Sequence, residues 1–172
     1  MRFAVMPSPA ILTPELVRFV TSHLSIHIAA SDGGGQATLV RGLGCRADPA
    51  VAGGLRLLAA RPQAEPVLRG IAADGRVAVV FSEPETHRTV QLKARDARVL
   101  APDDDDTALL APYTDTLVTR LACVGTPEPF VRALLACPPD ELIVVCATPD
   151  EVFGQTPGPL AGERLDAAHP LP

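Results

Sequence analysis

Two strand-like segments separated by a proline-containing break constrain the fold of this chain most strongly. Residues 76–81 are apolar and β-branched, which is typical of a buried strand. The segment after the break alternates, so one of its faces carries His87, Thr89, Gln91 and Lys93. The intervening Glu-Pro-Glu cannot continue a central strand, because proline lacks a backbone donor. The pattern predicts two antiparallel strands, the second with a polar row that either faces water or holds a polar ligand.

The length and composition indicate one domain with an ample core. The chain has 172 residues, of which 47% are hydrophobic. We expect the domain to span residues 1–150 and a proline- and glycine-rich tail to span 151–172. No apolar run is long enough for a membrane span, and no signal-peptide pattern is present, so we expect a cytoplasmic protein. The four cysteines show no CxxC spacing, which favours reduced, mostly buried thiols over a zinc or disulfide framework.

The charge pattern argues against nucleic acid as a partner. The net charge is −5, which argues against a basic surface. The chain has no Trp and one Tyr, so it also has few aromatic side chains on which nucleotide bases could stack. Nearly all positive charge is arginine, with Lys93 as the only lysine. An anion site in this chain would therefore be local and built from arginine, whose planar fork suits phosphate.

The order of elements predicts an antiparallel architecture. Thr13 and Pro14 have the residue types of a helix N-cap and first helical position. We expect helices at 14–22, 64–73, 103–121 and 126–135, and strands at 25–30, 36–46, 55–60, 76–81, 87–100 and 142–147. Because the strands arrive mostly as hairpins, the predicted fold class is α+β and mainly β, an antiparallel sheet or barrel with flanking helices.

Two groups of residues are candidates for binding. Arg41-Gly-Leu-Gly-Cys-Arg46 places two guanidinium groups around two glycines, including Gly42, which could clamp a phosphate or form an exposed strand with solvated arginines. His87, Arg88, Thr89 and Gln91 could present polar groups to a heterocycle, or simply face solvent.

Other polar clusters point to structure rather than chemistry. His23 and His27 are four residues apart, but this spacing crosses from a helix end into a strand, so we expect no metal site there. Asp103–Asp106 is interpreted as a solvated acidic run at a helix N-terminus. No nucleophile and base can be paired from these spacings, so no catalytic residue is assigned. A cofactor that carries out the chemistry needs few protein groups, which fits the absence of a predicted nucleophile–base pair.

Residues 77–94, from Val-Ala-Val-Val-Phe to Val-Gln-Leu-Lys-Ala, and the closing Val152-Phe-Gly-Gln-Thr-Pro-Gly-Pro159 resemble the pyridoxamine 5′-phosphate oxidase-related, FMN-binding split-barrel family. The resemblance implies a six-stranded antiparallel split barrel that forms a homodimer with FMN at the subunit interface. It also implies a flavin-mediated redox reaction on a small molecule.

The resemblance implies roles for particular residues. Arg41 and Arg46 stand at the spacing of an Arg-x4-Lys pair that contacts the flavin and its phosphate. Arg88-Thr-Val-Gln91 matches an Arg-Gln-Val-Arg segment, so Thr89 takes the place of a flavin-contacting glutamine. Strand parity places His87, Thr89 and Gln91 on one face, as pocket-lining residues.

One segment departs from the family pattern. Where the oxidases place a phosphate-binding Ser-Arg-Lys, this chain aligns Glu65-Pro66-Val67, so two cations are replaced. Arg61 or Arg69 would have to compensate for this loss of charge-assisted hydrogen bonds. Two further hypotheses therefore stay open: a non-catalytic ligand-binding protein with a degenerate flavin site, and a relative that uses a deazaflavin or haem.

Overall fold

The computed structural model describes residues 11–32 and 34–165. Its helices are α1 (Pro14–Val20), α2 (Arg61–Asp74), α3 (Asp104–Ala122) and α4 (Glu128–Leu135), with a 3-10 turn at Pro139–Glu141. Its strands are β1 (Ser25–Ser31), β2 (Ala37–Arg41), β3 (Gly44–Ala47), β4 (Leu55–Ala60), β5 (Val77–Ser82), β6 (Thr89–Ala94), β7 (Arg98–Leu100), β8 (Leu142–Ala147) and β9 (Glu151–Gly154).

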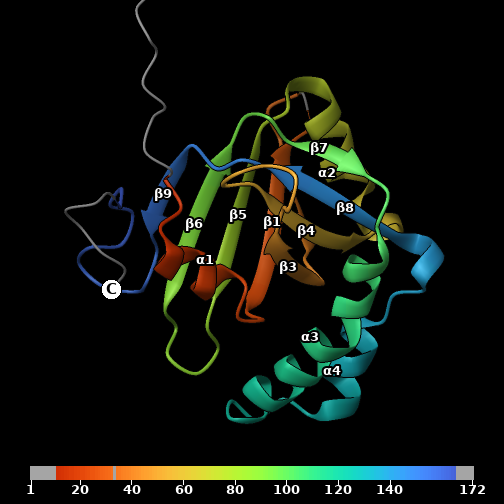
Figure 1. The fold of residues 1–172 in the computed structure, drawn as a ribbon. Helices are drawn as coiled ribbons and strands as arrows, with labels where there is room; N and C mark the ends of the chain where they lie inside the picture. The colour runs from red at the N-terminus through yellow and green to blue at the C-terminus, as the bar shows by residue number, and fades with distance from the viewer. Residues whose placement is uncertain (1–10, 33, 166–172) are drawn as a thin grey trace, which may run out of the picture.

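The strands form two sheets, and every ladder between the described strands is antiparallel. One sheet has the order β2-β1-β5-β6-β9, and the other has the order β3-β4-β8-β7. Figure 1 shows β1, β5, β6 and β9 side by side, with β8, β4 and β7 across the molecule from β9 and helices α3 and α4 together at one end. The predicted α+β class with antiparallel sheets and flanking helices is confirmed.

The core lies between the two sheets. The four-stranded sheet has continuously buried strands at β4 and β8, whereas the five-stranded sheet alternates along β1, β5, β6 and β9. Alternation means that one face of the five-stranded sheet packs on the core and the other stays half-exposed. The half-exposed face is the surface on which a ligand can be placed.

Two long predicted strands are each divided between the sheets. The segment at 36–46 forms β2 in one sheet and β3 in the other, and the segment at 87–100 forms β6 and β7 in the same manner. Gly42 lies where the chain passes from β2 to β3. A Cβ at this position would lie 2.6 Å from Ile26 Cγ2, so only glycine allows the chain to pass so close to β1. With β9 added, the structure therefore has nine described strands where six were expected.

Strand β9 lies within the segment that we assigned to the tail. Glu151–Gly154 alternates in burial and pairs with β6, and Phe153 within this strand also forms an antiparallel bridge with Arg164. The Pro- and Gly-rich residues between Gly154 and Glu163 form the turn that connects these paired segments, with Gly162 N donating to Gly154 O at 2.7 Å. Within the described residues, no helix is long and apolar enough to cross a membrane.

Candidate functional site

The half-exposed face of the five-stranded sheet, which we call the outer face, is organised in rows across the strands. Cross-strand register places in one row Arg41, His27, Val80, Gln91 and Phe153. The next row holds Leu39, Ala29, Ala78, Lys93 and Glu151. All of these side chains are half-buried except that of Leu39, which is 63% exposed. The outer face therefore combines small apolar side chains with polar and charged ones.

An open groove of about 480 Å³ lies over the part of the outer face that carries the second row, and Arg41, His27 and Gln91 of the first row are not in its lining. Ala29 and Ala78, which are adjacent in the second row, lie in its lining together with Arg76, Lys93 and Arg95. Two alanines on neighbouring strands make a flat, shallow floor, because neither side chain extends beyond Cβ. A floor of this kind, bordered by cations, suits a planar ligand that carries negative charge.

The cations of the outer face differ in how far their charge is compensated. Arg95 Nε lies 3.3 Å from Asp150 Oδ2, and Arg76 lies 3.9 Å from Asp74. Lys93 Nζ instead lies 4.5 Å from the centroid of the Phe153 ring, a cation–π geometry that leaves the ammonium charge in place. In the described part of the chain, Arg41 has no carboxylate within 4 Å. Arg41 and Lys93 are therefore the cations best suited to a ligand.

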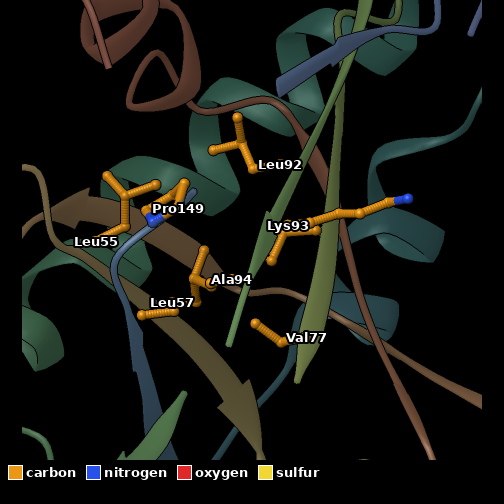
Figure 2. Close-up of a pocket in the computed structure, with 9 residues that line it drawn as sticks. Leu55, Leu57, Val77, Leu92, Lys93, Ala94 and Pro149 are labelled. Atoms are coloured by element: carbon orange, nitrogen blue, oxygen red, sulfur yellow. The ribbon is translucent and has the colours of Figure 1, made fainter. Parts of the chain in front are cut away.

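A small cavity lies in the interior of the molecule. A cavity of about 10 Å³ lies between the sheets, lined on one side by Leu55 and Leu57 and on the other by Val77, Leu92 and Ala94. Figure 2 shows the side chain of Lys93 extending away from these apolar side chains. The cavity can hold at most one water molecule, so it is too small for a cofactor.

Three of the residues predicted to bind the cofactor lie on the outer face. Arg41 and Gln91 share one row, separated by His27 and Val80. Thr89 lies two residues before Gln91, on the same face of β6. The Thr89 hydroxyl lies 3.0 Å from Ser82 Oγ and donates to His87 O at 2.9 Å, while Gln155 Nε2 donates to Gln91 Oε1 at 3.4 Å. The structure thus brings Thr89 and Gln91 together and places Arg41 at the opposite edge of the sheet.

Three other predicted residues lie away from the outer face. Arg46 belongs to the four-stranded sheet, where it is ion-paired with Asp103 and Asp106, and is not beside Arg41. Gly42 is buried, and its carbonyl oxygen accepts from Tyr113 Oη at 3.2 Å. Arg61 is exposed at the first residue of α2. The expected Arg41–Arg46 clamp is not formed, because the chain changes sheets between the two arginines.

The predicted strand start at His87 is wrong. His87 has φ = 61° and is exposed in the turn between β5 and β6, so strand parity does not apply to it. The turn is closed by Glu83 N donating to Arg88 O at 2.9 Å. Arg88 stacks its guanidinium on the ring of Phe19 at 4.6 Å, and its buried Nε has no hydrogen-bond partner among the described residues. These two residues border the hairpin rather than line the groove.

The segment Glu65-Pro66-Val67 lies inside α2. Val67 is fully buried and Glu65 is exposed, so neither offers a donor to phosphate, and the helix has no side-chain N-cap. The departure seen in the sequence is therefore also a structural one. The segment Glu65–Val67 therefore supplies no cation to a phosphate.

The structure also shows the surroundings of His23, His27 and the acidic run Asp103–Asp106. His27 is on the outer face, where burial and the nearby Arg41 charge lower its pKa from the ordinary value of 6.5. His23 instead contacts α3, with Nδ1 3.0 Å from Thr116 Oγ1. Among the described residues, no three His, Cys, Asp or Glu side chains are grouped to hold a metal ion. Asp106 was interpreted as solvated, but it is fully buried against Arg46 and Arg56.

The cysteines are free thiols. Cys45 and Cys146 are buried as expected, whereas Cys123 is exposed. Burial raises the pKa of the Cys45 thiol, which keeps it protonated and unreactive.

Comparison with solved structures extends the description of the fold. The chain is similar to HupZ of Group A Streptococcus, with a TM-score of 0.50 at 12% identity, covering 88% of this chain and 100% of that one. The expected split-barrel fold is confirmed. Other similar structures include a candidate pyridoxamine 5′-phosphate oxidase from Lactobacillus delbrueckii, at TM-score 0.49, 21% identity and coverages of 86% and 97%. HutZ, the heme storage protein of Vibrio cholerae, matches at TM-score 0.46, 14% identity and coverages of 83% and 94%.

No family model matches the sequence, and no curated protein is significantly similar to it. At these identities the likeness to solved structures concerns the fold alone. The position of a ligand must therefore be argued from the residues of this chain.

Sequence reasoning missed the floor of the groove and the position of His27. Ala29 and Ala78 are neighbours only through the β1–β5 register, which no local pattern reveals. The alternation of β1 could have placed His27 opposite the buried Ile26 and Ile28. Lys93 was visible in the polar row, although its contact with Phe153 depends on β9.

Proposed function

We propose that this protein is an FMN-binding, pyridoxamine 5′-phosphate oxidase-like flavoprotein, and an oxidoreductase on a small molecule. The observation that carries the proposal is the open groove of the outer face, with its flat Ala29–Ala78 floor and cationic border. The flavin ring would lie over this floor beside Lys93, which lines the groove, and the rest of the cofactor would extend along the sheet toward Gln91, Thr89 and Arg41, which lie on the outer face beyond the groove lining. When bound, a flavin supplies hydride and electron transfer. The protein groups named here bind and orient it.

The proposal predicts that filling the groove floor blocks flavin binding. In the variant Ala78→Leu, the added side chain occupies the volume above the floor, so we expect FMN to bind at least about tenfold more weakly. The measurement is a titration of the purified protein with FMN, followed by quenching of flavin fluorescence. Because Ala78 is half-exposed, the substitution does not disturb the core.

Ala72→Leu is the matched control, since Ala72 is exposed on α2 and does not line the groove. Its FMN affinity should equal that of the unmodified protein. Equal affinities for all three proteins would show that FMN does not use the groove, and no binding to the unmodified protein would reject a flavin function.

A second function is favoured by the start of α2. Exposed Glu65 and buried Val67 replace the cations that the resemblance implies for the phosphate. A non-catalytic ligand-binding protein with a degenerate flavin site would show this loss. In that case the titration would detect no FMN binding to the unmodified protein. Another planar anion such as haem would still bind the groove of the unmodified protein, and the Ala78→Leu variant would bind it more weakly.

We also propose that the outer face takes part in a homodimer. It carries the 63% exposed Leu39 at one edge and the half-buried Val80 and Phe153 further across. A two-fold interface repeats such apolar contacts on both subunits. We expect Leu39→Glu to shift the protein from dimer to monomer in sedimentation analysis at micromolar concentration. Leu160→Glu, at an equally exposed leucine in the turn after β9, should leave the dimer intact.

A further inference from the structure

Three polar side chains meet at the β1–β2 corner of the outer face. Arg41 and His27 are direct cross-strand partners, and Ser25 lies two residues before His27 on the same face. Arg41 Nη1 lies 3.5 Å from Ser25 Oγ. All three side chains are half-buried. The corner therefore places a guanidinium, an imidazole and a hydroxyl side by side on the outer face, beyond the lining of the groove.

The charge of this corner is not balanced by acidic groups among the described residues. No carboxylate lies within 4 Å of Arg41, in contrast to Arg46, Arg95 and Arg120, which all have carboxylate partners. Strand β5 places Val80 opposite His27 and Ser82 opposite Ser25, and neither side chain titrates. On β1 itself the neighbour on this face is Ala29. Arg41 is therefore the only charged group packed against His27 in the described structure.

His27 is poised to respond to an anion. Burial and the Arg41 charge lower its pKa from 6.5, so the free imidazole is neutral at pH 7. An anion bound between the side chains of His27 and Arg41 would offset the positive charge of Arg41 and so favour the protonated form of His27. The resulting imidazolium would donate a charge-assisted hydrogen bond to the anion. This change needs only a proton from solvent and involves no redox step.

We propose that the Ser25–His27–Arg41 corner binds the phosphate of FMN and that His27 takes up one proton as the phosphate binds. This inference rests on the proposed function for the identity of the ligand. The proton moves from water to a ring nitrogen of His27, and the phosphate oxygens accept hydrogen bonds from His27, Arg41 and Ser25. The corner thereby replaces the phosphate contacts that the start of α2 does not supply.

The test compares FMN affinities of the unmodified protein and His27→Gln at about pH 5.5 and about pH 8, on either side of an ordinary histidine pKa. Glutamine keeps a polar side chain but cannot be protonated. The loss of FMN affinity caused by the substitution should be at least about fivefold greater at the lower pH, since only the unmodified protein gains the imidazolium there. Protonation of the phosphate itself, with a second pKa of about 6, changes free FMN in the same way in both titrations, so at each pH the two proteins are compared with a ligand of the same charge.

Two controls make the result specific. His23→Asn removes a histidine that contacts Thr116 and Tyr113 instead of the outer face, and asparagine tolerates its φ of 58°. This variant should show the same FMN affinity as the unmodified protein at each pH. Riboflavin, which lacks the phosphate, should show no pH-dependent difference between His27→Gln and the unmodified protein.

The outcomes separate this inference from the proposed function. If FMN binds but the effect of His27→Gln is the same at both pH values, or appears equally with riboflavin, the corner proposal is overturned while flavin binding stands. If neither flavin binds, the flavin function fails, and inorganic phosphate then tests the corner directly. An upward shift of the His27 ring titration in NMR spectra on adding phosphate supports the corner, and an unchanged titration overturns it.

Discussion

Replacing Asp106 by asparagine is expected to lower the free energy of unfolding by about 3–5 kcal/mol, because it removes the buried carboxylate that pairs with the buried Arg56 and leaves that arginine only the half-exposed Asp103 at 3.5 Å. Asp106 is 0% exposed and Arg56 is 7% exposed. Arg56 donates to both carboxylate oxygens of Asp106, and Arg46 Nε donates to Oδ1 at 2.7 Å. The measurement is urea denaturation followed by circular dichroism.

The geometry of β3 and β4 explains the size of this effect. Arg46 and Arg56 are direct cross-strand partners, an arrangement in which like charges repel. Asp106, at the third residue of α3, lies between the two guanidinium groups and also completes a reciprocal cap with Asp103. The D106N variant would therefore lose the buried one of the two carboxylates that compensate these cations, keep only Asp103, and loosen the attachment of α3 to the four-stranded sheet.

The dependence on pH follows from the direction of the pKa shift. Burial alone would raise the pKa of Asp106, but hydrogen bonds from Arg56 and Arg46 outweigh it and hold that pKa far below the usual range. The stability that this carboxylate adds is complete above its unfolded pKa of about 4. It is lost only as the pH falls through the lower folded pKa. The difference between D106N and the unmodified protein should therefore stay constant from neutral pH to about pH 4 and shrink in stronger acid.

Asp115→Asn is the control for Asp106→Asn. Asp115 also pairs with an arginine, at 2.9 Å from Arg132, but both side chains are about half-exposed. Such surface pairs contribute about 0–1 kcal/mol. Similar losses of stability in the two variants would contradict a special role for the buried cluster.

Gly70→Ala is expected to destabilise the protein by about 1–3 kcal/mol or more, as overpacking of a tight contact does. A Cβ at Gly70 would lie 2.1 Å from the backbone oxygen of Ser31 and 2.9 Å from the Cβ of Ala30. Because the obstructing atom belongs to the backbone of β1, it cannot move aside as a flexible side chain would. Helix α2 would have to withdraw from the edge of the five-stranded sheet.

The sign of the Gly70 effect is the diagnostic feature. In an ordinary helix interior, replacing glycine by alanine stabilises the protein by roughly 1 kcal/mol. Thermal or urea unfolding of the variant should show the opposite change. A stabilised variant would mean that α2 does not pack on β1 as closely as described.

Local patterns predicted much of the fold. Thr13 caps α1 by accepting from Leu16 N at 3.2 Å, and Pro14 begins the helix as its residue type indicated. The alternating row at Thr89, Gln91 and Lys93 lies on the half-exposed face of β6. These features depend on neighbours within a few residues, so the sequence contains the necessary information.

The candidate site was predicted less completely, because it depends on the crossing between the sheets. Arg41 and Arg46 are five residues apart, yet Gly42 and Gly44 carry the chain from one sheet into the other between them. Arg46 therefore meets Asp106, a partner sixty residues away, while Arg41 remains on the outer face beside His27. No periodicity of a single segment distinguishes these two fates.

The amino-acid sequence by itself determined the class of secondary structure, the cap of α1, and which face of β6 is polar. The tertiary structure alone decided which arginines keep an uncompensated charge, since ion pairing depends on atoms brought together from distant segments. It also decided that two alanines on adjacent strands form the floor of a groove. Burial and strand register act through space, and this is why the residues of a binding surface are fixed only when the sheets assemble.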